Sequence, residues 1–134
     1  IARLLLEAGA AVNQAEEDGA TPLIMACQEG RLECAQLLLK ASAVVDQARN
    51  DGTTPLCAAS LAGEVDCVRL MIAAGAAVNQ ADYDGFTPLY AACQESHVEI
   101  ARLLLEAGAA VNQARNNGVT PLYIACQNGH LECV

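Results

Sequence analysis

A stretch that begins Thr-Pro-Leu occurs four times in the chain, at intervals of 33 residues. The copies are TPLIMACQEG at 21–30, TPLCAASLAG at 54–63, TPLYAACQES at 87–96 and TPLYIACQNG at 120–129. Residues 1–15 and 100–114 are identical. Self-similarity at a fixed period of this length is typical of solenoids, in which each unit packs on its neighbours. We therefore expect a single array of about four units over residues 1–134.

Each unit is predicted to contain a short helix followed by a longer one. Thr21 is a suitable N-cap, and Pro22 suits the first helical position, where the backbone N–H has no intrahelical partner. The second helix is expected from about Leu32 to Lys40, and apolar residues recur along both. Neither helix could bury its apolar side chains alone, so the units are expected to stack into an all-α solenoid.

The segments between helix pairs carry turn signals. A piece with the sequence Val-Asn-Gln-Ala is expected to be extended, and an Asp-Gly or Asn-Gly pair follows in every unit. The pairs are Asp18-Gly19, Asp51-Gly52, Asp84-Gly85 and Asn117-Gly118. Both residues of such pairs can adopt positive φ, which predicts two-residue β-hairpin turns at the tips. Gly75 and Gly108 are expected to cap the longer helices, and Ser42 should be less favourable in that role.

Composition and charge exclude several classes of function. The net charge of −9 opposes binding to nucleic-acid phosphates and to anionic membranes. The longest apolar runs are about ten residues, half of what is needed to cross a bilayer. No GxSxG, HExxH or phosphate-binding glycine loop occurs. We therefore expect no enzymatic activity and no cofactor.

The seven cysteines are expected to be packing residues. All but Cys57 recur at two positions of the repeat, which are occupied by Cys27, Cys93 and Cys126 and by Cys34, Cys67 and Cys133. No CxxC pair occurs, so neither a disulfide framework nor a zinc site is expected. The two histidines, His97 and His130, should hydrogen-bond the backbone near the start of the longer helix. Free thiols favour a reducing compartment, which predicts a cytoplasmic location, with the nucleus also open.

The repeat resembles the ankyrin repeat over the whole chain. The family signature T-P-L-H-x-A is matched by Thr21, Pro22, Leu23 and Ala26 and by the three later copies, and LLLEAG at 4–9 and 103–108 is also typical. The resemblance implies an ankyrin-repeat solenoid with β-hairpin tips. It also implies a non-enzymatic scaffold that binds a protein or peptide on the concave face formed by the tips and short helices.

This sequence departs from the signature at one position. The signature's histidine is replaced by Ile24, Cys57, Tyr90 and Tyr123. In the family, that histidine usually joins neighbouring units by hydrogen bonds. We therefore expect either other contacts between the units or a lower stability.

Positions that differ between units are the candidates for partner binding, because a packed core position varies little between stacked copies. None of the four aromatic residues falls at a position expected in the core. Tyr83 and Phe86 flank the third turn, Tyr90 and Tyr123 lie in short helices, and one mostly glutamine position lies near the end of each short helix. With their equivalents in other units, the candidate residues are Glu17, Gln28, Asn50, Thr53, Leu61, Tyr83, Phe86, Tyr90, Gln94, Asn116, Val119, Tyr123 and Gln127.

Other interpretations stay open at these positions. Tyr90 and Tyr123 can simply fill space between units, and Tyr83 and Phe86 can be scattered surface residues. Charge alternates along the tips, which are acidic at 16–18, more basic at Arg49 and Arg115, and acidic around Tyr83. An extended peptide of alternating charge is therefore a candidate ligand.

Two other classes of function remain as alternatives to the interaction scaffold. The array could be a structural spacer or a regulatory arm of a larger protein, or it could be an engineered repeat array. Ile1 and Val134 both fall inside a longer helix, so both terminal units are expected to be incomplete and the chain to be an interior segment of a longer array. We expect a monomer, with end-to-end packing possible through the terminal units.

Overall fold

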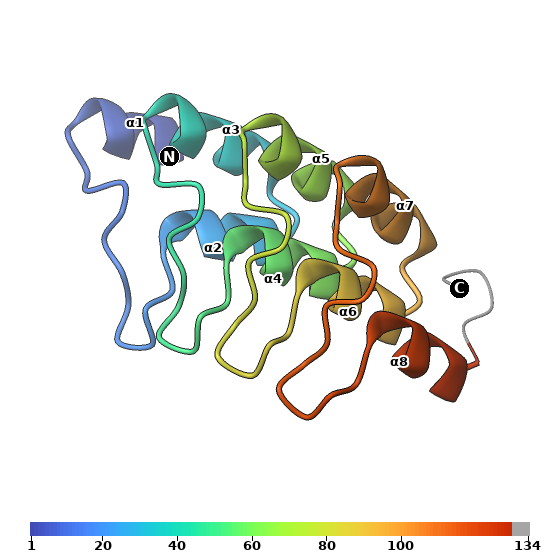
Figure 1. Cartoon of the computed structure of the whole chain (residues 1–134). Coiled ribbons are helices and arrows are strands. Elements are labelled where there is room, and N and C mark those ends of the chain that lie inside the picture. Colours follow the sequence, from blue (N-terminus) through green and yellow to red (C-terminus); the bar gives the residue numbers. More distant parts are fainter. Residues whose placement is uncertain (130–134) are drawn as a thin grey trace.

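The computed structural model of the chain describes residues 1–129 (Figure 1). These residues form the helices α1 (Ala2–Glu7), α2 (Pro22–Gln28), α3 (Leu32–Lys40), α4 (Pro55–Ala62), α5 (Val65–Ala73), α6 (Pro88–Gln94), α7 (Val98–Glu106) and α8 (Pro121–Gln127). The predicted all-α class and the alternation of short and longer helices are confirmed. His130, Cys133 and the expected start of a further longer helix lie outside the described residues.

The helices form two parallel layers. Figure 1 shows the odd-numbered helices in one row and the even-numbered, shorter helices in a second row, with the connecting loops projecting past the second row. Short helices pack on the neighbouring short helices, and α2, α4 and α6 also pack on the longer helix that follows each of them. Neighbour-on-neighbour packing is thus the organising contact, as the period predicts.

Threonine and proline start each short helix. The Oγ1 of Thr21, Thr54, Thr87 and Thr120 accepts the backbone N–H three residues later at 3.1–3.2 Å. Proline follows as the first helical residue in all four. The hydroxyl thus satisfies one of the free N–H groups at the helix start, and proline removes another. Thr21, Thr54 and Thr87 are buried, so these caps also belong to the interior.

Small and medium aliphatic side chains and thiols fill the space between the two layers. Leu23, Leu56, Met71, Ile100 and Leu104 are each at most 1% exposed. Burial is densest in the middle of the stack, where α4 and α6 have buried residues on almost every side, and α1 has none. Except for Tyr90, the buried side chains among residues 1–129 lack large rings, which suits units that must approach each other closely.

The tips differ from the two-residue turns predicted from the sequence. The N–H of Gly19 donates to the carbonyl of Glu16 at 2.9 Å, and the N–H of Glu16 donates to the carbonyl of Ala20 at 2.9 Å. Gly19 has positive φ (86°), whereas Asp18 does not. This pattern is a three-residue hairpin loop, with a turn followed by a left-handed glycine. The hairpin hydrogen bonds are present, but no residue among 1–129 belongs to a strand.

The side chain of Asp18 is the physical reason for this difference. Its Oδ1 accepts the N–H of Ala20 at 2.9 Å, and the equivalent bonds of Asp51 and Asn117 are 2.9 and 3.0 Å long. These contacts two residues ahead favour a turn in which only the glycine needs the left-handed region. The Val-Asn part of the preceding segment is also a turn and is not extended as expected.

Two serines take the left-handed conformation that glycine takes elsewhere. Ser42 (φ 71°) replaces the glycine that follows α5 and α7, namely Gly75 (φ 86°) and Gly108 (φ 92°). Ser96 (φ 60°) does the same between α6 and α7. A residue with a side chain is less stable than glycine in the left-handed region. We therefore still expect Ser42 to be a less favourable cap than Gly75 or Gly108.

Side chains also hydrogen-bond one unit to the next. The Oδ1 of Asn13 accepts the N–H of Val44 at 2.9 Å, and Asp46 and Asn79 make the equivalent bonds to the following unit at 3.1 and 2.8 Å. These bonds span 31 residues and repeat along the stack. They join neighbouring units in a chain whose units lack the signature histidine.

Candidate functional site

The four tips are hydrogen-bonded to one another in a row. The backbone N–H groups of Asn50, Tyr83 and Asn116 donate to a carbonyl of the preceding tip at 2.9–3.0 Å. The side-chain amides of Asn50 and Asn116 add bonds to the carbonyls of Glu17 and Tyr83, at 2.8 and 2.6 Å. The tips and the adjacent sides of the short helices therefore form one continuous surface, which we call the inner surface.

The candidate residues differ in how far they reach solvent. The exposed candidates are Glu17, Asn50, Leu61, Tyr83, Asn116, Tyr123 and Gln127. The half-buried ones are Gln28, Thr53, Phe86, Gln94 and Val119, and Tyr90 alone is buried. Their burial shows which side chains a ligand could reach without rearrangement of the stack.

Tyr83 is the most exposed aromatic residue of the described chain, at 75%. It occupies the position at which Asn50 and Asn116 hydrogen-bond the preceding tip. Tyrosine has no side-chain amide. This tip therefore keeps the backbone hydrogen bond to the carbonyl of Asp51 (3.0 Å) and lacks the side-chain bond. At the third tip, a solvent-exposed ring thus takes the place of the side-chain amide that joins two units elsewhere.

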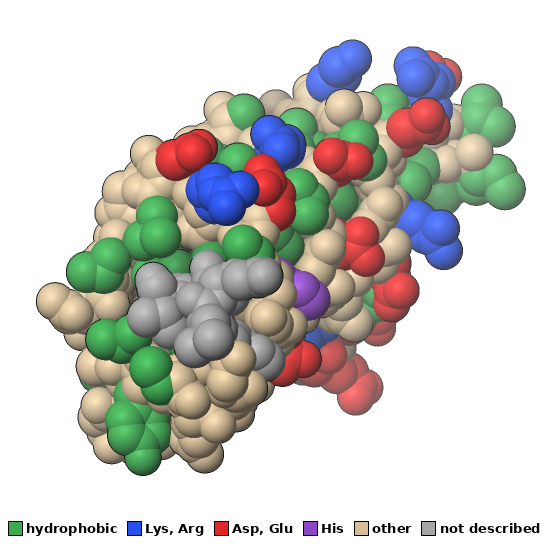
Figure 2. Space-filling model, turned by 90° about the vertical axis from the view of Figure 1, so that its right-hand side faces the viewer, with side chains coloured by type: hydrophobic (Ala, Val, Ile, Leu, Met, Phe, Trp, Pro, Cys, Tyr) green, Lys and Arg blue, Asp and Glu red, His purple; other side chains and the backbone are tan. Residues whose placement is uncertain are grey.

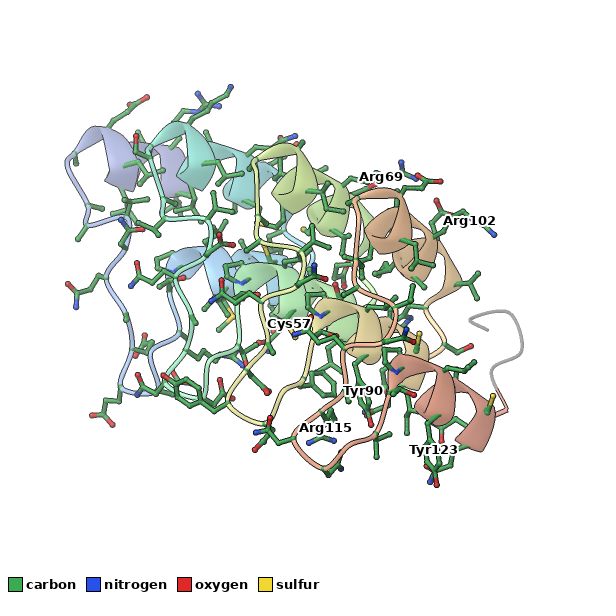
Figure 3. The ribbon with its side chains drawn as sticks, in the orientation of Figure 1. Cys57, Arg69, Tyr90, Arg102, Arg115 and Tyr123 are labelled. Atoms are coloured by element: carbon green, nitrogen blue, oxygen red, sulfur yellow. The ribbon has the colours of Figure 1, made fainter. Side chains whose placement is uncertain are left out.

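Phe86, Tyr90 and Arg115 form an aromatic and cationic cluster across two units. The ring centroids of Phe86 and Tyr90 are 5.1 Å apart with an angle of 59° between the planes. The guanidinium carbon of Arg115, from the next tip, lies 5.4 Å from each centroid. Figure 3 shows Arg115 and Tyr90 side by side where the fourth tip meets α6. Cation–π contacts of this kind stabilise by about 0.5–2 kcal/mol.

The expectation that Tyr90 lies outside the core is wrong. Its side chain is 2% exposed, because Phe86 and the following unit cover it. Of the two interpretations left open for this residue, the structure favours the one in which it fills space between units. Ile24 and Cys57, at the same repeat position, are buried too, whereas Tyr123 is 59% exposed and no later tip within residues 1–129 covers it.

Arg49 and Arg115 do not project from the tips. A terminal nitrogen of Arg49 donates to the side-chain oxygen of Gln28, on the preceding short helix. Arg115 also lies over α6, where its guanidinium carbon is 5.4 Å from the centroid of the Tyr90 ring. The candidate residues inferred from the sequence include neither arginine. The signal was available, because both share one repeat position with Glu16 and Asp82 beside the turn.

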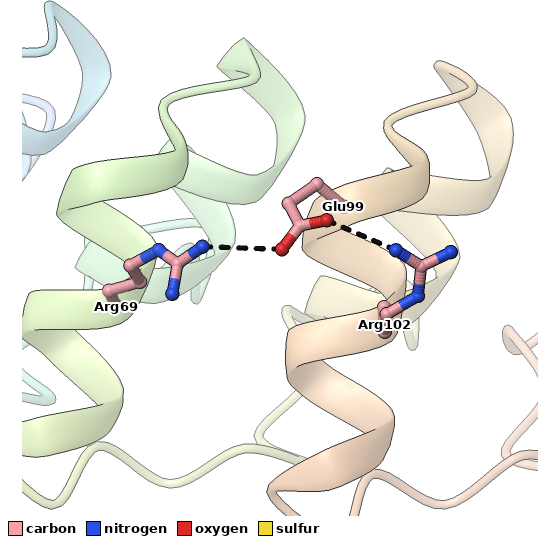
Figure 4. A network of polar contacts seen from close by, with 3 residues as sticks. All are labelled: Arg69, Glu99 and Arg102. Atoms are coloured by element: carbon pink, nitrogen blue, oxygen red, sulfur yellow. Dashed lines mark hydrogen bonds and ion pairs between the residues drawn. The ribbon is translucent and has the colours of Figure 1, made fainter.

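The longer helices carry the two ion pairs of the described chain. Glu99 accepts from Arg69 at 3.2 Å and from Arg102 at 3.3 Å, bridging α5 and α7 (Figure 4). In Figure 2, basic and acidic side chains lie intermixed along the upper part of the molecule, where Figure 1 places these helices. Exposed pairs of this type contribute at most about 1 kcal/mol each. The outer layer therefore balances its charges locally.

The buried cysteines behave as packing residues. Burial raises the pKa of the Cys27 thiol to about 12, and burial together with the negative charges of Asp82 and Asp51 does the same for Cys57. Both thiols stay protonated and weakly nucleophilic at neutral pH. No group of three or more His, Cys, Asp or Glu side chains within residues 1–129 is placed to hold a metal ion. Over the same range, no helix has the length and apolar character that a membrane crossing requires.

His97 hydrogen-bonds the backbone, but across units. It precedes α7, as expected, and its Nε2 lies 3.2 Å from the carbonyl oxygen of Leu61 near the end of α4. Its ring also lies against Gly63, where a Cβ would approach the ring to 2.8 Å. The prediction placed the acceptor at the start of the longer helix, whereas the acceptor belongs to the preceding unit.

Stacked helix pairs with hydrogen-bonded hairpin loops define a helical-repeat solenoid. The family described as ankyrin repeats (3 copies) matches residues 1–82, 41–115 and 74–134 of this sequence. The chain belongs to the ankyrin repeat family. Ankyrin repeats are generally protein–protein interaction modules and typically lack enzymatic activity. No curated protein matches the sequence.

Proposed function

We propose that residues 1–134 form a single array of about four units that binds a partner protein or peptide on its inner surface, which is the concave side of the solenoid. The array acts as a non-enzymatic scaffold without a cofactor. The observation that carries the proposal is the third tip, where Tyr83 is 75% exposed beside the half-buried Phe86. Aromatic side chains are common anchors of protein interfaces, and one that becomes buried typically contributes about 2 kcal/mol or more.

The surroundings of Tyr83 support an interface at this tip. The equivalent positions on the other tips are Glu17, Asn50 and Asn116, so an apolar ring stands between polar neighbours. An apolar centre with a polar rim is the usual composition of such a surface. The hydrogen bonds between tips hold this surface in place, which lowers the ordering cost of binding. Free, buried thiols fit a cytoplasmic location, and the net charge of −9 fits a protein partner better than a nucleic acid.

Selection of random linear peptides displayed on phage tests the proposal. Peptides are recovered on the wild-type chain and assayed on the double variant Tyr83→Ala/Phe86→Ala. We expect binding to fall by about tenfold or more, because both anchors are removed. The matched control is Arg102→Ala/Leu105→Ala, which changes two exposed residues of α7 and should bind normally. Circular dichroism must show both variants folded. Equal binding by the two variants would remove the inner surface as the binding site.

A further inference from the structure

The guanidinium of Arg115 is held in place without an anionic partner. The chain has 16 acidic and seven basic residues, and yet no carboxylate among residues 1–129 forms an ion pair with Arg115. Its Nε is shielded from solvent and has no acceptor. The outer arginines Arg69 and Arg102, in contrast, share Glu99. Arg3, Arg31, Lys40 and Arg49 also form no ion pair among residues 1–129, but Arg115 differs from them in lying over two aromatic rings.

The neighbours of Arg115 on its own tip are neutral. The repeat position of Asp51 is occupied by Asn117 in the fourth tip. Arg49 is the equivalent arginine two units earlier. Its charge helps to lower the pKa of the Asp51 carboxyl, and its guanidinium donates a hydrogen bond to the side chain of Gln28. Arg115 has no such carboxylate on its own tip, and the acidic residues of the neighbouring tip are Asp82 and Asp84.

The two rings restrict the positions open to the guanidinium of Arg115, whose carbon lies 5.4 Å from each centroid. A guanidinium stacked on aromatic faces uses its flat face for that contact, and its N–H donors point outward in the plane. Arg115 as a whole is half-buried, and its shielded Nε has no acceptor. A planar carboxylate can meet the edge of a guanidinium with two parallel hydrogen bonds. Because the stacking already restricts the side chain, less entropy is lost on binding.

We propose that Arg115 binds the carboxylate of an Asp or Glu side chain in an extended peptide segment of the partner, and that an adjacent apolar residue of this segment packs against Tyr83 and Phe86. This assignment rests on the proposed function and specifies the chemistry of its partner. A carboxylate suits the site better than a phosphate group. Only the guanidinium of Arg115 lies at these rings, and a dianion would be repelled more strongly than a carboxylate by a chain of net charge −9.

The test compares peptide selections on three forms of the chain. Random linear peptides are selected on the wild type, on Arg115→Gln and on the outer-helix control Arg102→Gln. We expect an acidic residue at a fixed distance from an apolar one in the wild-type and Arg102→Gln sets, and no acidic position in the Arg115→Gln set. A Glu→Gln change in a selected peptide should weaken binding to the wild type about tenfold and leave binding to Arg115→Gln unchanged.

Two further measurements separate geometry and ligand source. Arg115→Lys keeps the charge but loses the stacked, two-bond geometry, so we expect it to bind the acidic peptide about tenfold more weakly. The Nε–Hε resonance of Arg115 should shift on addition of the acidic peptide. A larger shift with inorganic phosphate at equal concentration, or full binding by Arg115→Lys, would overturn the assignment.

The outcomes also distinguish this inference from the proposed function. Peptides that depend on Tyr83 and Phe86 but show no acidic position would overturn the carboxylate assignment and leave the inner surface as the binding site. Failure to recover any peptide on the wild type would overturn both.

Discussion

At the scale of single residues, the exposure of a side chain depends on the unit that follows it. Tyr90 and Tyr123 occupy the same repeat position, but one is 2% and the other 59% exposed. Arg115 covers the first ring and nothing within residues 1–129 covers the second. The sequence identifies the position, but not the covering side chain, because that side chain lies 25 residues further along and its direction is set by the fold.

Asp51 is a residue whose charge is favoured in the folded chain. Burial alone would raise the pKa of its carboxyl, but the hydrogen bonds from the side chain and backbone of Thr53 and the charge of Arg49 outweigh it and hold the pKa below its usual range. A carboxyl with a lowered folded-state pKa stabilises the fold above its unfolded pKa, near 4, and this stability is lost as the pH falls through the folded pKa.

The first prediction concerns acid sensitivity. Asp51→Asn should keep the acceptor for the N–H of Thr53, as Asn117 does for Val119, and should remove the titration. We expect the unfolding free energy to fall less between pH 7 and pH 3 than in the wild type, by less than about 1 kcal/mol since the group is exposed. Urea titrations at both pH values measure this difference.

Asp84→Asn is the matched control for this prediction. It changes the same repeat position in the third tip, where Asp82 accepts the N–H of Phe86 at 2.9 Å in place of Asp84. The control should retain the acid sensitivity of the wild type. If both variants lose it equally, then general charge and not the bond to Thr53 is responsible.

At the scale of elements, the start of each short helix was predictable and the shape of each tip was not. Thr-Pro specifies a cap and a first turn through local chemistry, and all four copies adopt it. An Asp-Gly pair is compatible with several turns. The choice between them depends partly on the hydrogen bond that Asp18 accepts from Ala20 in the same tip. It also depends on the bonds between neighbouring tips, and these are not contained in any single unit. The direction of Arg49, toward Gln28, was missed for the same reason.

The second prediction tests the hydrogen bonds that join one unit to the next. The Oδ1 of Asn79 accepts the N–H of Ala110 at 2.8 Å, whereas Asn112, at the same repeat position, is exposed and has no following unit within residues 1–129 to bond. Asn79→Ala should therefore lower the unfolding free energy by about 1 kcal/mol, and Asn112→Ala by less than about 0.5 kcal/mol. Urea unfolding followed by circular dichroism compares them, and equal losses would contradict a role in joining units.

At the scale of the whole molecule, stability should follow the contact of each unit with its neighbours. In a linear array, no residue of the first unit meets one of the last, so each interface contributes separately. The buried side chains of α4 lie between α2 and α6, whereas α1 contributes no buried residue. The middle units should accordingly open last, and their amide hydrogens should exchange most slowly.

The third prediction measures this dependence with one substitution at two equivalent positions. Leu56 and Leu122 are both the second helical residue of a short helix, but they are 0% and 54% exposed. Leu56→Ala removes a side chain enclosed by two neighbouring units and should cost about 2–5 kcal/mol. Leu122→Ala changes an identical local sequence position that is open to solvent and should cost less than about 1 kcal/mol. Because the two variants share helix propensity, cap and chemistry, the difference in their urea midpoints isolates the burial that a neighbour provides. Similar midpoints would mean that the units are stabilised from within, and stacking would then not be what holds the chain together.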